Sequence, residues 1–511
     1  MSGVGANGRA SQLVALLLLL LGGCAVGPNF HPPAAPAVSG YTPTPLPVKT
    51  SAADVPGGGA QNFVQGLDIS GQWWELFHSQ ALNRMIAEAL KDNPDLASAE
   101  AALREANENV YAAQGGLFPT VTGSFQAERQ AFSAAEFGGT TSESATFNLV
   151  TPTLLVSYPI DVFGGVRRQV ESLAATAEFE RFELEAAYLT LTSNVVVAAI
   201  DEASLRGQIA ATEDIIRVES DQLNVLEQQF ELGAVAKAEV LSQQATLAAT
   251  QASLPGLEKQ LSQTRDRLAD LLGRYPSAVP PTEFDLAGLT LPEQLPVSLP
   301  SALVAERPDV LAAEATLHAA SANIGVAIAN ELPQFTISGE YGSEALGFTS
   351  LFTPATTIWS IAGGAATTLF DGGTLLHKKR AAVAAFNQAA AQYRSTVLAA
   401  FQNVADALHA LISDANALAA QVAAEQAAAT SLDLARRQFA LGAISYPTLL
   451  DAEKTYQQAR IGLVQAEATR FADTAGLFQA LGGGWWHRAD VPEAAQGSPD
   501  RFWLVGAVTG H

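Results

Sequence analysis

Residues 93–106, NPDLASAEAALREA, return as RPDVLAAEATLHAA at residues 307–320, and this repetition decides the fold. In each copy, the helical stretch that begins with this segment ends at a proline, Pro119 in the first copy and Pro333 in the second. Similar segments in the same order and at the same spacing indicate a tandem duplication of the chain. We therefore expect each structural element of the first half to have a counterpart in the second half.

Each copy carries the same series of predicted elements. A helix is followed by two segments of strand character, a Gly-Gly turn and a long helical hairpin. The hairpin tips are marked by FELGAVAKAEVL from residue 230 and by FALGAISYPTLL from residue 439. The predicted limits are a first repeat at 73–272, with a β-hairpin at about 120–160 and a helical tip at about 232–235; an equatorial connector at 273–300; a second repeat at 301–484, with a β-hairpin at about 334–370 and a tip at about 441–444; and a C-terminal tail at 485–511.

The helical hairpins are predicted to be long. Residues 165–232 contain no proline, and as one helix they would extend about 100 Å at about 1.5 Å per residue. In the partner helix, leucines recur every seven residues, which is typical of a coiled-coil seam, at Leu247, Leu254, Leu261 and Leu268. Apart from the strand segments, we therefore expect an all-α chain.

The amino terminus accounts for the position of the only cysteine. The stretch LLLLLLGGCAVGPNF places Cys24 directly behind an apolar run that is too short to span a membrane. With Arg9 before the run, this is the layout of an export signal, and the Leu-Gly-Gly-Cys sequence resembles a bacterial lipobox, whose cysteine is acylated. We predict a signal peptide at 1–23 and a lipid-anchored, proline-rich extended segment at 24–72. The alternative is a plain secreted protein with an incidental cysteine.

The strand segments are predicted to form a membrane β-barrel. In the first segment Val121, Phe125 and Ala127 alternate with polar residues, as in a sheet with one apolar and one wet face. A soluble sandwich would show similar alternation, but export and lipidation favour a membrane. Two hairpins give four strands, which are too few to close a barrel, and open edges in lipid would leave backbone amides unpaired. We therefore expect several copies of the chain to assemble.

Composition and motifs argue against other classes of function. The formal net charge is -23 and no basic patch is present, which disfavours nucleic acid as a partner. The seven histidines form no close metal-binding pair, and the sequence has no phosphate-binding loop and no nucleophile elbow. We expect no enzyme activity, no metal and no cofactor other than the covalent lipid on Cys24.

Seven stretches carry a family resemblance and together cover nearly the whole mature chain: CAVGPNF, WWELF, NPDL, ERPDVLAAEATLHAASANIGVA, LFDGG, LGAISYPTLLDAE and ALGGGW. The chain resembles TolC-type outer-membrane factors, specifically the lipoprotein branch, often called the NodT family, that serves resistance-nodulation-division efflux pumps. His78-Ser79-Gln80 departs from the family, which commonly has Asp-Pro after the WWxxF segment.

The resemblance implies a homotrimer in the bacterial outer membrane, in which four strands from each chain close a twelve-stranded β-barrel. The barrel would continue as a long α-helical, coiled-coil tunnel across the periplasm, with the connector and the terminal segments in an equatorial girdle. In this family the tunnel meets a periplasmic adaptor (membrane fusion) protein and an inner-membrane transporter. It passively carries small toxic molecules or drugs out of the cell.

The resemblance also suggests that the hairpin tips dock the adaptor. In this sequence the tip residues are Leu232 and Gly233 in the first repeat and Leu441 and Gly442 in the second. The alternative is that both glycines serve only to end helices, and one residue can do both.

A periplasmic aperture is implied just after the second tip. Family members narrow the duct there with aspartates, and LGAISYPTLLDAE places Asp451 at that position and Thr448 where some relatives have a second aspartate. The alternative is a solvated aspartate on an outer helix face, which gains support because the first-repeat equivalent is Ser242.

Three hypotheses of function remain, of which an efflux duct is favoured. A TolC-like duct for type I protein secretion is the alternative, and a neighbouring peptidase-type transporter gene would favour it. A lipid-anchored coiled-coil adhesin or scaffold would need no duplicated β-hairpins, and conductance in planar bilayers separates it from a duct.

Overall fold

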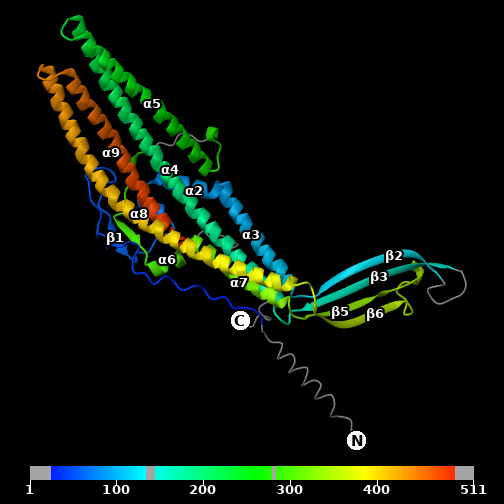
Figure 1. Cartoon of the computed structure of the whole chain (residues 1–511). Helices are drawn as coiled ribbons and strands as arrows, with labels where there is room; N and C mark the ends of the chain where they lie inside the picture. Colours follow the sequence, from blue (N-terminus) through cyan, green and yellow to red (C-terminus); the bar gives the residue numbers. More distant parts are fainter. Residues whose placement is uncertain (1–24, 134–143, 279–283, 489–511) are drawn as a thin grey trace. The chain divides into compact units, whose positions relative to one another are not determined.

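The computed structural model describes residues 25–133, 144–278 and 284–488. The chain divides into two compact units, each of which takes elements from both repeats (Figure 1). The first unit is made of Met1–Pro33, Arg104–Phe179 and Ala313–Tyr393, and the second of Ala34–Leu103, Glu180–Ala312 and Arg394–His511. The predicted signal peptide, Cys24 and the C-terminal tail beyond residue 488 lie outside the described residues.

Both repeats contain the same elements in the same order. The first repeat forms α2 (Gln80–Asp92), α3 (Pro94–Gly115), β2 (Thr120–Ser133), β3 (Ser144–Ile160), α4 (Gly165–Glu231) and α5 (Lys237–Leu271). The second forms α6 (Pro300–Glu306), α7 (Pro308–Ala329), β5 (Gln334–Ser343), β6 (Thr357–Ala366), α8 (Thr374–Ala440) and α9 (Tyr446–Ala480). The counterparts α4 and α8 have 67 residues each, and α5 and α9 have 35 each, so the predicted duplication is confirmed.

The two longest helices begin in the same way. The Asp161 carboxylate accepts two backbone N–H hydrogen bonds from the first turn of α4, both at 3.0 Å. The Asp371 carboxylate accepts two around the start of α8, at 2.8 and 2.7 Å. These bonds satisfy N–H groups that have no partner within a helix. Left-handed glycines, Gly164 with φ 75° and Gly373 with φ 89°, make the preceding turn from the strand.

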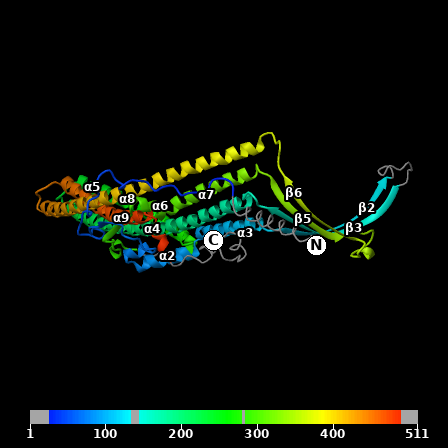
Figure 2. The same ribbon diagram turned by 90° about the horizontal axis from the view of Figure 1, so that it is seen from below.

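Four antiparallel strands form one sheet in the first unit, in the order β2-β3-β5-β6 (Figure 2). Residues directly opposite each other share a face, and the pairs Val121–Val156, Leu154–Tyr341 and Tyr341–Trp359 place large apolar side chains together. Most large apolar residues of this face are exposed, namely Val121, Phe125, Leu154, Val156, Ile337, Tyr341, Trp359 and Ile361, whereas Val150 on the same face is buried. The other face is mostly polar, with Thr122, Ser124, Gln126, Ser338, Glu340 and Ser360. The sheet thus has the predicted apolar and wet faces.

A buried arginine fastens the N-terminal segment to α9 in the second unit. Arg470 is fully buried, and its guanidinium donates hydrogen bonds to Thr50 Oγ1 and to the Gly59 carbonyl, both at 3.1 Å. A third bond reaches the Leu411 carbonyl of α8 at 3.0 Å. Because a buried cation is costly without partners, these acceptors hold the segment in place.

A short parallel pair of strands was not predicted. β1 (Asn62–Gln65) pairs with β4 (Gln294–Val297). The segment at 24–72, expected to be an extended tether, therefore contains a strand that is held by the connector. The two strands of a parallel pair come from distant parts of a chain, so no local sequence pattern predicts their pairing.

Candidate functional site

Both helical hairpins end in the same turn. Gly233 and Gly442 take the left-handed conformation, with φ of 76° and 71°. In each turn the following alanine N–H donates to a carbonyl of the last helical turn at 2.8 Å, which is how a glycine ends a helix. The preceding leucines, Leu232 and Leu441, are 85% and 84% exposed, and a Cβ added to either glycine would meet no atom within 4 Å. Each tip therefore presents an exposed leucine beside open backbone.

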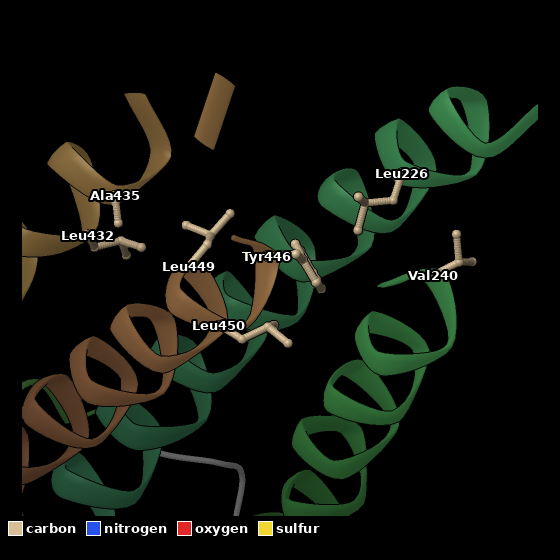
Figure 3. Packing of buried hydrophobic residues seen from close by; sticks show 7 residues of the cluster. All are labelled: Leu226, Val240, Leu432, Ala435, Tyr446, Leu449 and Leu450. Atoms are coloured by element: carbon tan, nitrogen blue, oxygen red, sulfur yellow. The ribbon is translucent and has the colours of Figure 1, made fainter. Parts of the chain in front are cut away.

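An apolar cluster beneath the tips holds the two hairpins together (Figure 3). It takes residues from all four helices: Leu226, Val240, Leu432, Ala435, Tyr446, Leu449 and Leu450. Tyr446 Oη donates a hydrogen bond to Gln243 Oε1 of α5, and Gln243 Nε2 donates to the Glu219 carbonyl of α4 at 2.9 Å. Burial raises the pKa of Tyr446, so the phenol keeps its proton and remains a donor. This path of hydrogen bonds connects both hairpins.

Thr448 and Asp451 lie on the exposed side of α9, away from the apolar cluster. They are one helical turn apart and share a face, whereas Leu449 and Leu450 are buried. The hydroxyl of Ser445, the N-cap of α9, contacts the Thr448 hydroxyl at 3.0 Å and caps no backbone N–H. Among the described residues the Asp451 carboxylate has neither a hydrogen bond nor an ion pair. The described part of the chain therefore leaves this carboxylate exposed and without a partner.

The residues that follow Cys24 are fixed to the first unit. The Val26 N–H donates to a carbonyl in the turn between β3 and α4 at 3.0 Å. Buried Arg168 donates from Nε to the Val26 carbonyl at 3.1 Å and from Nη2 to Asn29 Oδ1 at 2.7 Å. The chain directly after the predicted lipid site thus lies against the end of the strand sheet.

Sequence reasoning missed two buried carboxylates near the tips, Glu219 on α4 and Glu453 on α9. Glu219 is only 3% exposed and Glu453 only 7% exposed. Burial raises the pKa of both groups, that of Glu453 to about 7. In the sequence DAEKTY, Glu453 is indistinguishable from a solvated helix residue, because its burial depends on packing against other helices, including α4 of the first repeat.

Comparison with known proteins places the fold in a family. The family model described as outer membrane efflux protein matches residues 85–274 and 299–483. The pyoverdine export outer membrane protein OpmQ of Pseudomonas putida is 31% identical over 424 residues, covering 82% of this chain and 89% of the relative. The probable outer membrane lipoprotein SilC of Salmonella typhimurium is 26% identical over 413 residues, covering 81% of this chain and 88% of the relative. The solved structure of the outer-membrane channel OprN is similar with a TM-score of 0.81 and 27% identity, covering 90% of this chain and 100% of that chain.

The sheet and the helical hairpins define an outer-membrane channel protein that extends into the periplasm. The chain belongs to the outer membrane efflux protein family, and the two family matches coincide with its two repeats. The predicted family, membrane location and efflux function are confirmed. As a member of this family the chain is a transport protein and not an enzyme.

Proposed function

We propose that the chain forms the trimeric exit duct of a tripartite efflux pump and passively conducts small toxic molecules or drugs to the outside. The observation that carries this proposal is the four-stranded sheet, with an exposed apolar face and two open edges. An exposed apolar face of this size is stable in lipid and not in water.

The open edges support a ring of three chains. β2 and β6 are the outer strands of the sheet, and each would leave a row of backbone groups unpaired in lipid. Pairing β6 of one copy with β2 of the next satisfies both edges. Three copies give twelve strands, enough for a barrel with an open lumen.

Cys24 is the proposed lipid anchor. The relative SilC, which is named a probable outer membrane lipoprotein, supports this assignment. The contacts of Arg168 and Val26 would hold the acylated end beside the turn between β3 and α4, where the sheet ends. From there the acyl chains can enter the membrane next to the barrel.

The tips at Leu232, Gly233, Leu441 and Gly442 are the proposed docking sites for a periplasmic adaptor. Their exposed leucines and open glycines allow another backbone to approach closely. The adaptor would link the duct to an inner-membrane transporter of the resistance-nodulation-division class, which supplies the energy. A duct for type I protein secretion shares these features and is the alternative, favoured if a peptidase-type transporter is encoded nearby.

Asp451 is the proposed gate residue of the periplasmic aperture, with Thr448 one turn away. The support is their shared exposed face, which their own chain leaves uncovered. In a trimer this face would repeat three times around one axis.

The duct is tested with purified protein in planar bilayers and in cells that lack their own outer-membrane channel. We expect stable cation-preferring channels, and drug resistance that returns only when the cognate adaptor and transporter are also present. A protein that stays in water and gives no conductance would contradict the proposal and favour a scaffold.

A further inference from the structure

A cavity of about 380 Å³ lies between α4, α8 and α9, adjoining the apolar cluster at the tips, with Leu432 belonging to both. Glu219 and Glu453 line it. Both carboxylate oxygens of Glu453 and Oε2 of Glu219 are buried without a hydrogen-bond partner. Burying carboxyl oxygens without hydrogen bonds costs free energy, so this arrangement does not serve the stability of the fold. The two carboxyls come from different hairpins, which makes them a link between the hairpins.

The charged groups around the pair come from each helix that lines the cavity. The nearest cation is Arg436 of α8, whose Nη2 is 3.7 Å from Glu453 Oε1, longer than a hydrogen bond. Lys454 of α9 acts on Glu219 from a greater distance. The other charged groups at the cavity have their own partners: Arg217 with Asp214, Asp433 with Arg437, and Arg460 with Glu425. On the side of α5 the neutral Gln243 and Thr250 lie nearby, and the charge of Glu239 acts on Tyr446, as do the charges of Glu453 and Glu219. Of the two buried carboxyls, Glu453 thus has a close cation, Arg436, whereas Glu219 has only the more distant Lys454.

We propose that Glu219 and Glu453 form a proton-sensitive lock, which keeps the two hairpins together while protonated and lets them part when both carboxyls are charged. Two negative charges facing each other across the hairpin interface repel, whereas neutral carboxyls are tolerated in the cavity. The inference rests on the proposed function, in which parting of the hairpins widens the periplasmic end of the duct.

The direction of the pH effect follows from Glu453. Its pKa is raised from 4.5 to about 7: burial is the main cause, Arg436 opposes the increase, and the charge of Glu219 contributes to it. The proton therefore binds more tightly when the hairpins are together than when they part and the carboxyl is hydrated. Hairpin packing is strongest below about pH 4.5, weakens as the pH rises, and stays constant above about pH 7. The pKa of Glu453 is about 7 when the hairpins are together and 4.5 when the carboxyl is hydrated. Over this pH range the equilibrium between packed and parted hairpins therefore changes by on the order of a hundredfold.

The test measures the distance between the two tips in the assembled trimer. Leu232→Cys and Leu441→Cys provide spin-label sites, and Cys24, the only native cysteine, does not react when it is acylated. A small fraction of labelled chains is mixed with unlabelled chains, so that distances within one chain dominate. We expect a longer and broader tip distance at about pH 8 than at about pH 5.

Three variants test the lock. Glu453→Gln, a neutral isostere, should hold the short distance at both pH values, and Glu219→Gln should weaken the response. Asp221→Asn changes an exposed carboxylate on the same helix as Glu219 and should respond as the wild type does. A wild-type response in both Gln variants, or no response in the wild type, overturns the lock. Channel conductance is recorded in parallel, because its absence would count against the duct itself and not against the lock.

Discussion

At the residue scale, the segment that follows the predicted signal peptide combines two roles, a proposed lipid anchor and contacts with the fold. Cys24 has no partner for a disulfide, since it is the only cysteine. Directly after it, Val26 and Asn29 bind the buried Arg168. The anchor and the fold are therefore separated by a single residue, which leaves no flexible linker between the proposed lipid and the strand sheet.

We predict that mature protein begins with an acylated Cys24. A single acyl chain binds a membrane only marginally, and additional chains add about 0.8 kcal/mol per buried methylene, so stable anchoring requires more than one. Mass spectrometry of the amino-terminal peptide from membranes should show the mass of a lipid-modified cysteine. An unmodified thiol at this position would show that the protein is merely secreted.

A second prediction at this scale concerns Gly442. Gly442→Arg should leave the trimer assembled but abolish efflux, because the added side chain occupies the open space at the tip. Any side chain at φ 71° is strained by about 1 kcal/mol, so Gly442→Ala serves as the control that carries the strain without the bulk. The measurements are native gel mobility and drug susceptibility, repeated for Gly233. Loss of the trimer in the Arg variants, or equal inactivity of the Ala variants, would mean that these glycines only end helices.

At the element scale, the register of the strand sheet determines which residues lie on the membrane face and which lie on the water face. Ile361 pairs with Gly339 on the apolar face, and the preceding residue, Ser360, pairs with Glu340 on the polar face. Neighbouring positions in one strand therefore provide a matched comparison.

We predict that Ile361→Arg prevents insertion whereas Ser360→Arg is tolerated. A lipid-facing arginine costs about 2–4 kcal/mol near the middle of a bilayer, and a lumen-facing one costs little. The measurement is the yield of heat-resistant trimer after folding into lipid vesicles. Equal yields for the two variants would indicate that neither face of the sheet lies in lipid.

Most elements could be predicted from the sequence because their signals are local. The strand alternation and the proline-free helices each depend on residues close together in the chain, and the duplication appears as a direct match between two stretches of sequence. The pairing of β1 with β4 and the burial of Glu453 could not be predicted, because both depend on contacts between segments more than a hundred residues apart. Glu453 is buried because α4 and α8 pack beside α9, and the sequence of α9 alone does not indicate this packing.

At the scale of the whole molecule, the duplication and the proposed trimer act together. Three chains with two hairpins each give six similar helical hairpins around one duct, while any residue that differs between the repeats occurs only three times. Glu453 and Asp451 are of this kind, since both belong to the second hairpin alone. The proposed trimer would therefore combine a nearly sixfold wall with threefold carboxyl groups.

Asp451 provides the prediction that depends on this symmetry. Its carboxylate is exposed on α9, and its first-repeat equivalent is Ser242, so a ring of carboxylates would have three members in a single layer. Three close carboxylates repel one another and attract cations, and divalent ions bind oxygen ligands of this kind. In single-channel recordings, divalent cations added on the periplasmic side should block the wild type and not Asp451→Ala. Ser242→Ala is the matched control, since it changes the equivalent exposed position without removing a charge, and it should be blocked like the wild type. Block that persists in Asp451→Ala would place the cation site elsewhere and leave Asp451 as a solvated residue on an outer face.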